Sequence, residues 1–163
     1  MEKGILDLLE TFSKLSDEYP NIELYTYGNT FDPDFMKKIQ SFDNKESIFI
    51  HGKIKGKEKF QAIADADCFI LPSWNEGQPL VLLEAMSQGT VIVASKVGFV
   101  PELLGEDYPF LFEAKNKKDL AQKIVQIIET PNEKWSDYLL KRFKINYSNR
   151  SHSEKLVNIF SSI

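Results

Sequence analysis

Residues 68–95 read CFILPSWNEGQPLVLLEAMSQGTVIVAS and contain the pattern that decides the fold. Two short apolar runs, CFIL and VIVAS, have the length and the residue types of buried strands. Between them, Pro79 to Gln88 has helical spacing, and Gly89 follows where a helix ends in a left-handed cap. A strand, a helix and a second strand in this order predict a βαβ unit with parallel strands.

The same alternation of helical and strand-like segments continues in both directions from this unit. Asp32 and Pro33 have the form of an N-cap and a first helical residue. The other predicted helices lie at residues 5–15, 57–64, 101–104 and 117–129, and the other strands in IELYTY, SIFIH and PFLF.

This order predicts an α/β, Rossmann-like fold in which a parallel sheet has helices on both faces. We expect a single domain over residues 1–163, with a core at 3–130 and a C-terminal helical segment at 134–163. The chain opens on a helix, so the strand that should precede it is absent, and in a doubly wound sheet that strand lies in the middle. We therefore expect upstream sequence to be missing, and the sheet to close over the gap or to borrow a strand from a partner.

Charge and composition exclude several classes of protein. The chain of 163 residues has a net charge of −4, and with a pI near 5.3 and no arginine stripe it is not expected to bind nucleic acid. A single cysteine, Cys68, allows no internal disulfide and agrees with a reducing cytoplasm. Residues 141–150 are basic, which suits either a solvated helix face or contact with an anionic membrane surface.

The loop after CFIL is the richest candidate for a binding site, because ligands of open parallel sheets lie beyond the carboxyl ends of the strands. Gly77 allows a ligand to approach the backbone closely. The helix predicted to open at Pro79 offers free amides and a positive dipole end, which suit a diphosphate. Glu76 lies beside these groups, so the loop is expected to bind an anionic ligand.

Glu84 lies five residues into the same helix, about 7.5 Å along its axis. This offset suits a carboxylate that reaches past a diphosphate to paired sugar hydroxyls. Glu84, Ser87 and Gln88 also share one helix face, so spacing alone explains Glu84 equally well as part of a solvated surface.

The segment EGQPLVLLEAMSQGTVIVAS, followed by VGFVPELL, resembles the donor-binding signature of the retaining GT-B glycosyltransferases of the group 1 class. The match consists of Glu76 and Glu84 with seven residues between them, a Gly-x-x-Val-Ala-like strand and a Gly…Pro-Glu turn. KGILDLLETFSKL, IELYTYG, SIFIHGKI and ADADCFILPS extend the resemblance over about residues 3–130. It implies the C-terminal domain of a GT-B enzyme.

The resemblance also implies a role for each matching residue. Lys3 would neutralise the donor diphosphate, the catalytic Glu76 would hold the transferred sugar, and Glu84 would bind the ribose diol of the nucleotide. Further donor contacts would come from backbone groups of the base loop Gly52, Lys53 and Ile54, and of the sugar-phosphate loop Gly77, Gln78, Pro79 and Leu80.

No metal and no other cofactor is implied, because Lys3 and helix amides can stabilise the charge on the departing diphosphate. Asp65-Ala66-Asp67 has the form of the metal-binding DxD of another glycosyltransferase fold. It precedes CFIL, however, and so lies at the end of the strand away from the ligand.

The function implied is a hexosyltransferase that moves a sugar, with retention, from a UDP- or GDP-sugar to a glycan or lipid-linked acceptor in surface polysaccharide biosynthesis. The partner implied is an upstream acceptor domain of the same enzyme, which would carry the arginine that pairs with Lys3; the chain alone would be inactive. Gln78 stands where families often have a bulky aromatic, which leaves the sugar open.

Two alternatives remain: a nucleotide-sugar epimerase of the same fold, against which the pair of Glu76 and Glu84 argues, or a non-catalytic nucleotide-sugar-binding or partner-binding module.

Overall fold

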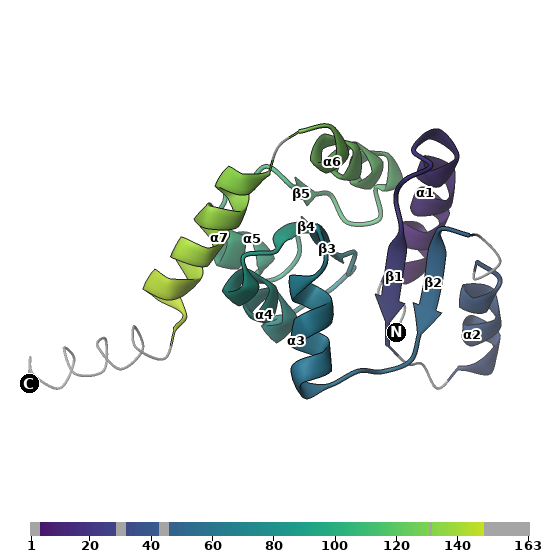
Figure 1. Ribbon diagram of the computed structural model, residues 1–163, viewed down its shortest axis with the longest axis horizontal. Coiled ribbons are helices and arrows are strands. Elements are labelled where there is room, and N and C mark those ends of the chain that lie inside the picture. Colours follow the sequence, from purple (N-terminus) through teal and green to yellow (C-terminus); the bar gives the residue numbers. More distant parts are fainter. Residues whose placement is uncertain (1–3, 29–31, 43–45, 131, 149–163) are drawn as a thin grey trace, which may run out of the picture.

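The computed structural model describes residues 4–28, 32–42, 46–130 and 132–148, in which helices and strands alternate (Figure 1). The strands are β1 (Leu24–Tyr27), β2 (Ile48–His51), β3 (Cys68–Leu71), β4 (Val91–Ser95) and β5 (Leu111–Phe112). The helices are α1 (Ile5–Glu18), α2 (Pro33–Gln40), α3 (Gly56–Ala64), α4 (Leu80–Gln88), α5 (Val100–Leu104), α6 (Lys117–Glu129) and α7 (Glu133–Asn146). All the strand pairs among these residues are parallel, which confirms the predicted α/β class.

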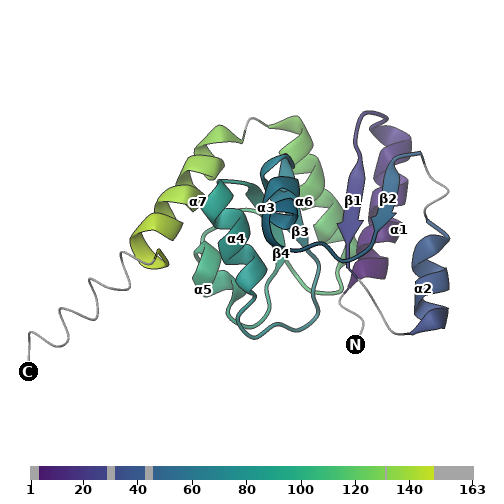
Figure 2. The ribbon, with the colours of Figure 1, turned by 60° about the horizontal axis from the view of Figure 1, so that its bottom comes forward.

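The strands form two sheets rather than one. Within the described residues, β1 pairs with β2, and β4 lies between β3 and β5. Figures 1 and 2 both place β1 between β2 and the second sheet, so β1 and β3 are the edges that face each other. The break falls where the first strand of a doubly wound sheet was expected. The sheet does not close over this gap in the described residues, and the borrowed strand stays a prediction.

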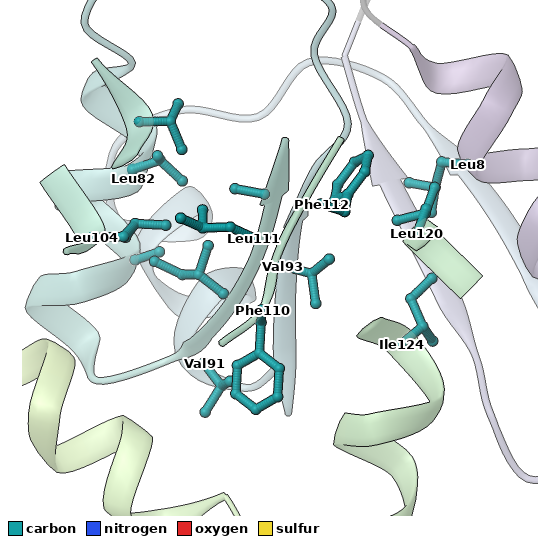
Figure 3. Close-up of a cluster of buried hydrophobic side chains, with 14 of the residues drawn as sticks. Leu8, Leu82, Val91, Val93, Leu104, Phe110, Leu111, Phe112, Leu120 and Ile124 are labelled. Atoms are coloured by element: carbon teal, nitrogen blue, oxygen red, sulfur yellow. The ribbon is translucent and has the colours of Figure 1, made fainter. Parts of the chain in front are cut away.

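Helices cover both faces of the sheet formed by β3, β4 and β5. Every residue of β4 is buried, as its apolar sequence predicts for a strand with helices on each side. Leu82 and Leu104 lie on one side of this sheet, and Leu120 and Ile124 lie on the other (Figure 3). Each fully buried leucine contributes about 1.5–3 kcal/mol, so this double-sided core holds the β3–β5 sheet rigid beneath the loops at its edge.

Helices α1 and α6 pack against each other and connect the two sheets. Leu8 of α1 and Leu120 of α6 are both buried and lie close together (Figure 3). An exposed ion pair joins Lys117 to Glu10 at 2.7 Å, and the hydrogen bond to Glu10 raises the pKa of Lys117. The buried leucines, rather than this solvated pair, stabilise the contact.

The helix α7 is continuous from Glu133 to Asn146, within the region where a C-terminal helical segment was expected. It packs on α4, and Gly89, the predicted cap of α4, has the left-handed φ of 74° and lies against Ser136. The division into a core and a helical segment at 134–163 stays a prediction, and residues 149–163 lie outside the described part. None of the helices within the described residues has the length and hydrophobicity that crossing a membrane requires.

Candidate functional site

The start of α4 lies next to the loop that follows β3. Pro79 is the N-cap, so the helix begins at Leu80, one residue later than predicted. No side chain caps this end, and the side chain of Leu80 is exposed. Pro79 has no N–H, so in the predicted sugar-phosphate loop the backbone donors are Gly77, Gln78 and Leu80. An uncapped helix start of this kind attracts anions.

Glu76 is held in place by two serines at the ends of the central strands. The Ser73 hydroxyl donates a hydrogen bond of 2.6 Å to Glu76 Oε1. The hydroxyl of Ser95, the last residue of β4, donates a bond of 2.5 Å to the backbone carbonyl of Ser73. Both serines are buried while Glu76 is half-buried, so the carboxylate is fixed to the β3–β5 sheet and still reaches solvent.

The loop after β4 supports the loop after β3 from the side. Phe99 N–H donates to the Gly77 carbonyl at 3.1 Å. Gly98 has a φ of 52°, and a Cβ built on it would lie 1.7 Å from the carbonyl oxygen of Glu76. Only glycine fits there, because the two backbones are in direct contact. A Cβ on Gly77, in contrast, would meet open space, which leaves the backbone of Gly77 accessible to a ligand.

The start of α1 lies beside the same loop. A Cβ on Gly4 would lie 1.8 Å from the Pro72 carbonyl oxygen, so the two backbones touch. Trp74 Nε1 donates to Asp7 Oδ2 at 2.8 Å, and Lys115 Nζ lies 4.9 Å from the centre of the Trp74 ring. Lys3 lies outside the described residues, so its predicted role is untested; its neighbour Gly4 is next to the candidate site.

Glu84 lies in the second turn of α4 and is paired with a lysine from another helix. Lys59 Nζ of α3 lies 2.5 Å from Glu84 Oε1. The second oxygen, Oε2, is buried and has no hydrogen-bond partner among the described residues. Glu84 is therefore neither a free surface carboxylate nor a fully paired one. Spacing alone left it open whether Glu84 binds sugar hydroxyls or belongs to a solvated helix face.

The predicted base loop, Gly52 to Ile54, leads from β2 into α3. Gly52 and Lys53 are exposed and Ile54 is half-buried. A Cβ on Gly52 would meet open space, so its backbone is accessible. Because Lys59 of α3 reaches Glu84, the helix that follows this loop is tied directly to the helix that follows the Glu76 loop.

The opposite end of the β3–β5 sheet holds the two aspartates that resemble a metal motif. Gln61 Nε2 donates to Asp65 Oδ1 at 2.7 Å, and Asp67 is exposed just before β3. A surface hollow of about 430 Å³ lies at this end, lined by Asp67, Thr90 and Asn132 among others. Across the described residues, no three His, Cys, Asp or Glu side chains come together as metal ligands would.

Sequence reasoning did not identify the residues that support the site. Ser95 and Gly98 lie within the matching segment, and the left-handed conformation of Gly98 is a reason why a glycine is needed there. Lys59 gave no sequence signal, because it is 25 residues away from its partner Glu84. Only the packing of α3 on α4 brings the two together.

Comparison with known proteins places the chain in a family. The model of the family described as "Glycosyl transferases group 1" matches residues 1–144. Sulfoquinovosyl transferase SQD2 of Arabidopsis thaliana is 31% identical over 125 residues, which are 74% of this chain and 24% of the relative. TuaC of Bacillus subtilis, a putative teichuronic acid biosynthesis glycosyltransferase, is 28% identical over 125 residues, which are 77% of this chain and 30% of the relative.

The fold agrees with this assignment. A crystal structure of a variant of S. aureus TarM, in complex with fondaparinux, alpha-GlcNAc-glycerol and UDP, superposes with a TM-score of 0.78 at 22% identity. The superposition covers 97% of this chain and 33% of TarM, so here too the chain spans well under half of the protein it resembles. The family match over most of its length shows that this chain belongs to the group 1 glycosyl transferases.

Proposed function

We propose that this chain is the donor-binding part of a retaining glycosyltransferase that transfers a sugar from a UDP- or GDP-sugar to a glycan or lipid-linked acceptor. The observation that carries the proposal is the start of α4, where an uncapped helix end, the accessible backbone of Gly77 and the anchored Glu76 lie together. These are the groups that a diphosphate and its attached sugar need.

The chemistry follows from where charge develops. Transfer from a nucleotide sugar builds negative charge on the departing diphosphate, so groups that bind this charge accelerate the reaction. The N–H groups of Gln78 and Leu80 and the dipole of α4 supply that stabilisation, and Lys3 adds a cation. No metal ion is needed for this step.

The two glutamates have different tasks. Glu76 binds hydroxyls of the transferred sugar, since Ser73 orients its carboxylate at the sheet edge. Glu84 binds the ribose diol through Oε2, the oxygen that has no partner in the free protein. The backbone of Gly52, Lys53 and Ile54 binds the nucleotide base, because this loop leads into the helix that is joined to Glu84.

The rest of the enzyme supplies the acceptor site. The chain spans less than a third of SQD2 and of TuaC, which leaves room in such proteins for an acceptor-binding domain. A strand from that part of the enzyme, placed between β1 and β3, joins the two sheets and brings the arginine that pairs with Lys3. The name of TuaC, a putative teichuronic acid biosynthesis glycosyltransferase, favours a surface polysaccharide as the product.

We place the enzyme in the cytoplasm, where nucleotide sugars are present. A lipid-linked acceptor would hold it at the inner face of the membrane. The basic residues 141–150 then contact anionic lipid there.

The roles of the glutamates can be separated by isothermal titration calorimetry with UDP and GDP, together with turnover of the enzyme that contains this chain. Glu84→Gln should weaken nucleotide binding about ten- to hundredfold, because a hydrogen bond to a charged group is lost. Glu76→Gln should leave nucleotide affinity within about threefold and reduce turnover much more, because Glu76 contacts the sugar. Unchanged nucleotide affinity in Glu84→Gln would disprove the ribose role, and equal losses of affinity and turnover in Glu76→Gln would disprove the sugar role.

A further inference from the structure

Lys59 is a charged residue in the candidate site to which neither the motif nor the family resemblance gives a role. It lies in the first turn of α3, and its ammonium group is 2.5 Å from Glu84 Oε1. The side chain of Lys59 is 33% exposed and that of Glu84 is 22% exposed, so the pair is partly shielded from water. Ion pairs in such surroundings interact more strongly than those on an open surface.

The pair leaves Glu84 half satisfied. A carboxylate has two oxygens that can each accept hydrogen bonds, and in the part of the chain that the structure describes only Oε1 has a partner. Buried polar atoms without partners are rare in folded proteins because each one lost its bonds to water on burial. The side chain of Glu84 as a whole is still 22% exposed, so a small adjustment of this side chain would bring Oε2 to a ligand hydroxyl, whose hydrogen bond would replace the one lost to water.

Lys59 also has donors to spare. An ammonium group carries three N–H donors, and the bond to Glu84 uses one of them. A hydroxyl group can donate one hydrogen bond and accept another. A ligand with neighbouring hydroxyls can therefore donate to Glu84 Oε2 and accept from Lys59 Nζ, and it would pair both charged groups at once.

We propose that Lys59 is a positioning and specificity residue for nucleotide binding, which holds Glu84 with Oε2 free and itself recognises the ribose diol. This inference rests on the proposed ribose role of Glu84 and adds a second group to it. Lys59 also fixes the helix after the base loop to the helix after the phosphate loop, so the base and ribose sites keep a constant separation. A nucleotide without the diol leaves both charged groups unmatched and binds more weakly.

The test compares UDP with its 2′,3′-dideoxy analogue, or GDP with its analogue where GDP binds more tightly. The ratio of the two dissociation constants measures recognition of the diol. The wild type should prefer the nucleotide with the diol by at least about tenfold, from hydrogen bonds to charged groups. Lys59→Met keeps most of the apolar stem but removes the charge, and should lower this ratio several-fold.

Two further variants make the result specific. Lys59→Arg keeps the charge and the donors, so it should retain most of the preference for the diol. Lys57→Met removes an exposed charge from the same helix and should leave the ratio unchanged. A purely structural tie between α3 and α4 would weaken both nucleotides equally, which leaves the ratio at its wild-type value and would overturn the proposal.

Glu84→Gln separates this inference from the function on which it rests. If Glu84→Gln removes the preference for the diol while Lys59→Met keeps it, only the role of Lys59 is wrong. If Glu84→Gln keeps the preference as well, the ribose role of Glu84 fails and the role of Lys59 fails with it. A wild-type enzyme that contains this chain and binds neither nucleotide would overturn donor binding altogether. Thermal unfolding of each variant shows that it is folded.

Discussion

Gly98 shows how much the candidate site depends on single residues. Its backbone lies against the carbonyl of Glu76, with a φ of 52° that side-chain-bearing residues rarely adopt. The N–H of Phe99, the residue after Gly98, donates a hydrogen bond to the carbonyl of Gly77 and so stabilises the same contact between the two loops. The conformation of the Glu76 loop is therefore set partly by the loop after β4, which contains Gly98.

Gly98→Ala should destabilise the protein by about 2 kcal/mol or more, because the new methyl group is strained and collides with backbone. Chemical denaturation in urea measures the change in the free energy of unfolding. Gly28→Ala is the matched control, since a Cβ there meets open space, and it should change stability by less than about 0.5 kcal/mol. Equal stability of the two variants would show that the loops are not in direct contact.

The helix α4 is the element on which the proposed chemistry depends. Its first residues follow a proline N-cap, which has no side-chain group that could bond to the N–H groups of the first turn. Its buried side, with Leu82, Ala85 and Met86, packs into the core, which fixes the direction of its dipole. A helix held in this way presents the positive end of its dipole at a fixed place, so no charged group has to move when the ligand binds or reacts.

Because the helix end and Lys3 supply the positive charge, nucleotide binding should not require a divalent cation. The dissociation constant for UDP or GDP is measured first with EDTA and then with excess Mg²⁺. The two values should agree within about threefold, which corresponds to less than half of the free energy that one hydrogen bond to a charged group contributes. Binding that is lost in EDTA and restored by Mg²⁺ would show that a metal carries the diphosphate.

The two sheets belong to one folded molecule, although no backbone hydrogen bonds pair β1 with β3 in the described residues. The contact of α1 with α6 joins them, and at the same time brings the start of α1 to the loop after β3 through Gly4 and Trp74. The position of the start of α1 beside this loop therefore depends on the packing of α1 against α6.

Leu120→Ala should lower the free energy of unfolding by about 2–5 kcal/mol, because it opens a cavity between α1, α6 and the β3–β5 sheet. Gln122→Ala, on the exposed side of α6, should stay within about 0.5 kcal/mol of the wild type. Far-UV circular dichroism during urea denaturation measures both. A loss as small as that of Gln122→Ala would mean that α1 and α6 are not a structural joint.

Most of the elements could be predicted from the sequence, because hydrophobic periods and caps are local. Asp32 caps α2 as expected, with bonds to the N–H groups of Asp34 and Phe35, and α6 has the bounds that its apolar spacing indicated. The parallel α/β class followed from the same local signals, whereas the family was indicated by the resemblance of residues 76–104 to a known signature. The start of α4 was wrong by one residue, since a proline suits both the N-cap and the first turn.

The helices, the strands, their parallel order and the place of the candidate site at the end of β3 are all encoded in local sequence patterns. Three features depend on the folded chain: the sheet is open between β1 and β3 in the described residues, Gly98 supports Glu76, and Lys59 pairs with Glu84. The physical reason is the distance along the chain over which each kind of interaction acts. A period or a cap is set by residues within a turn of one another, whereas a pair 25 residues apart depends on how two helices pack.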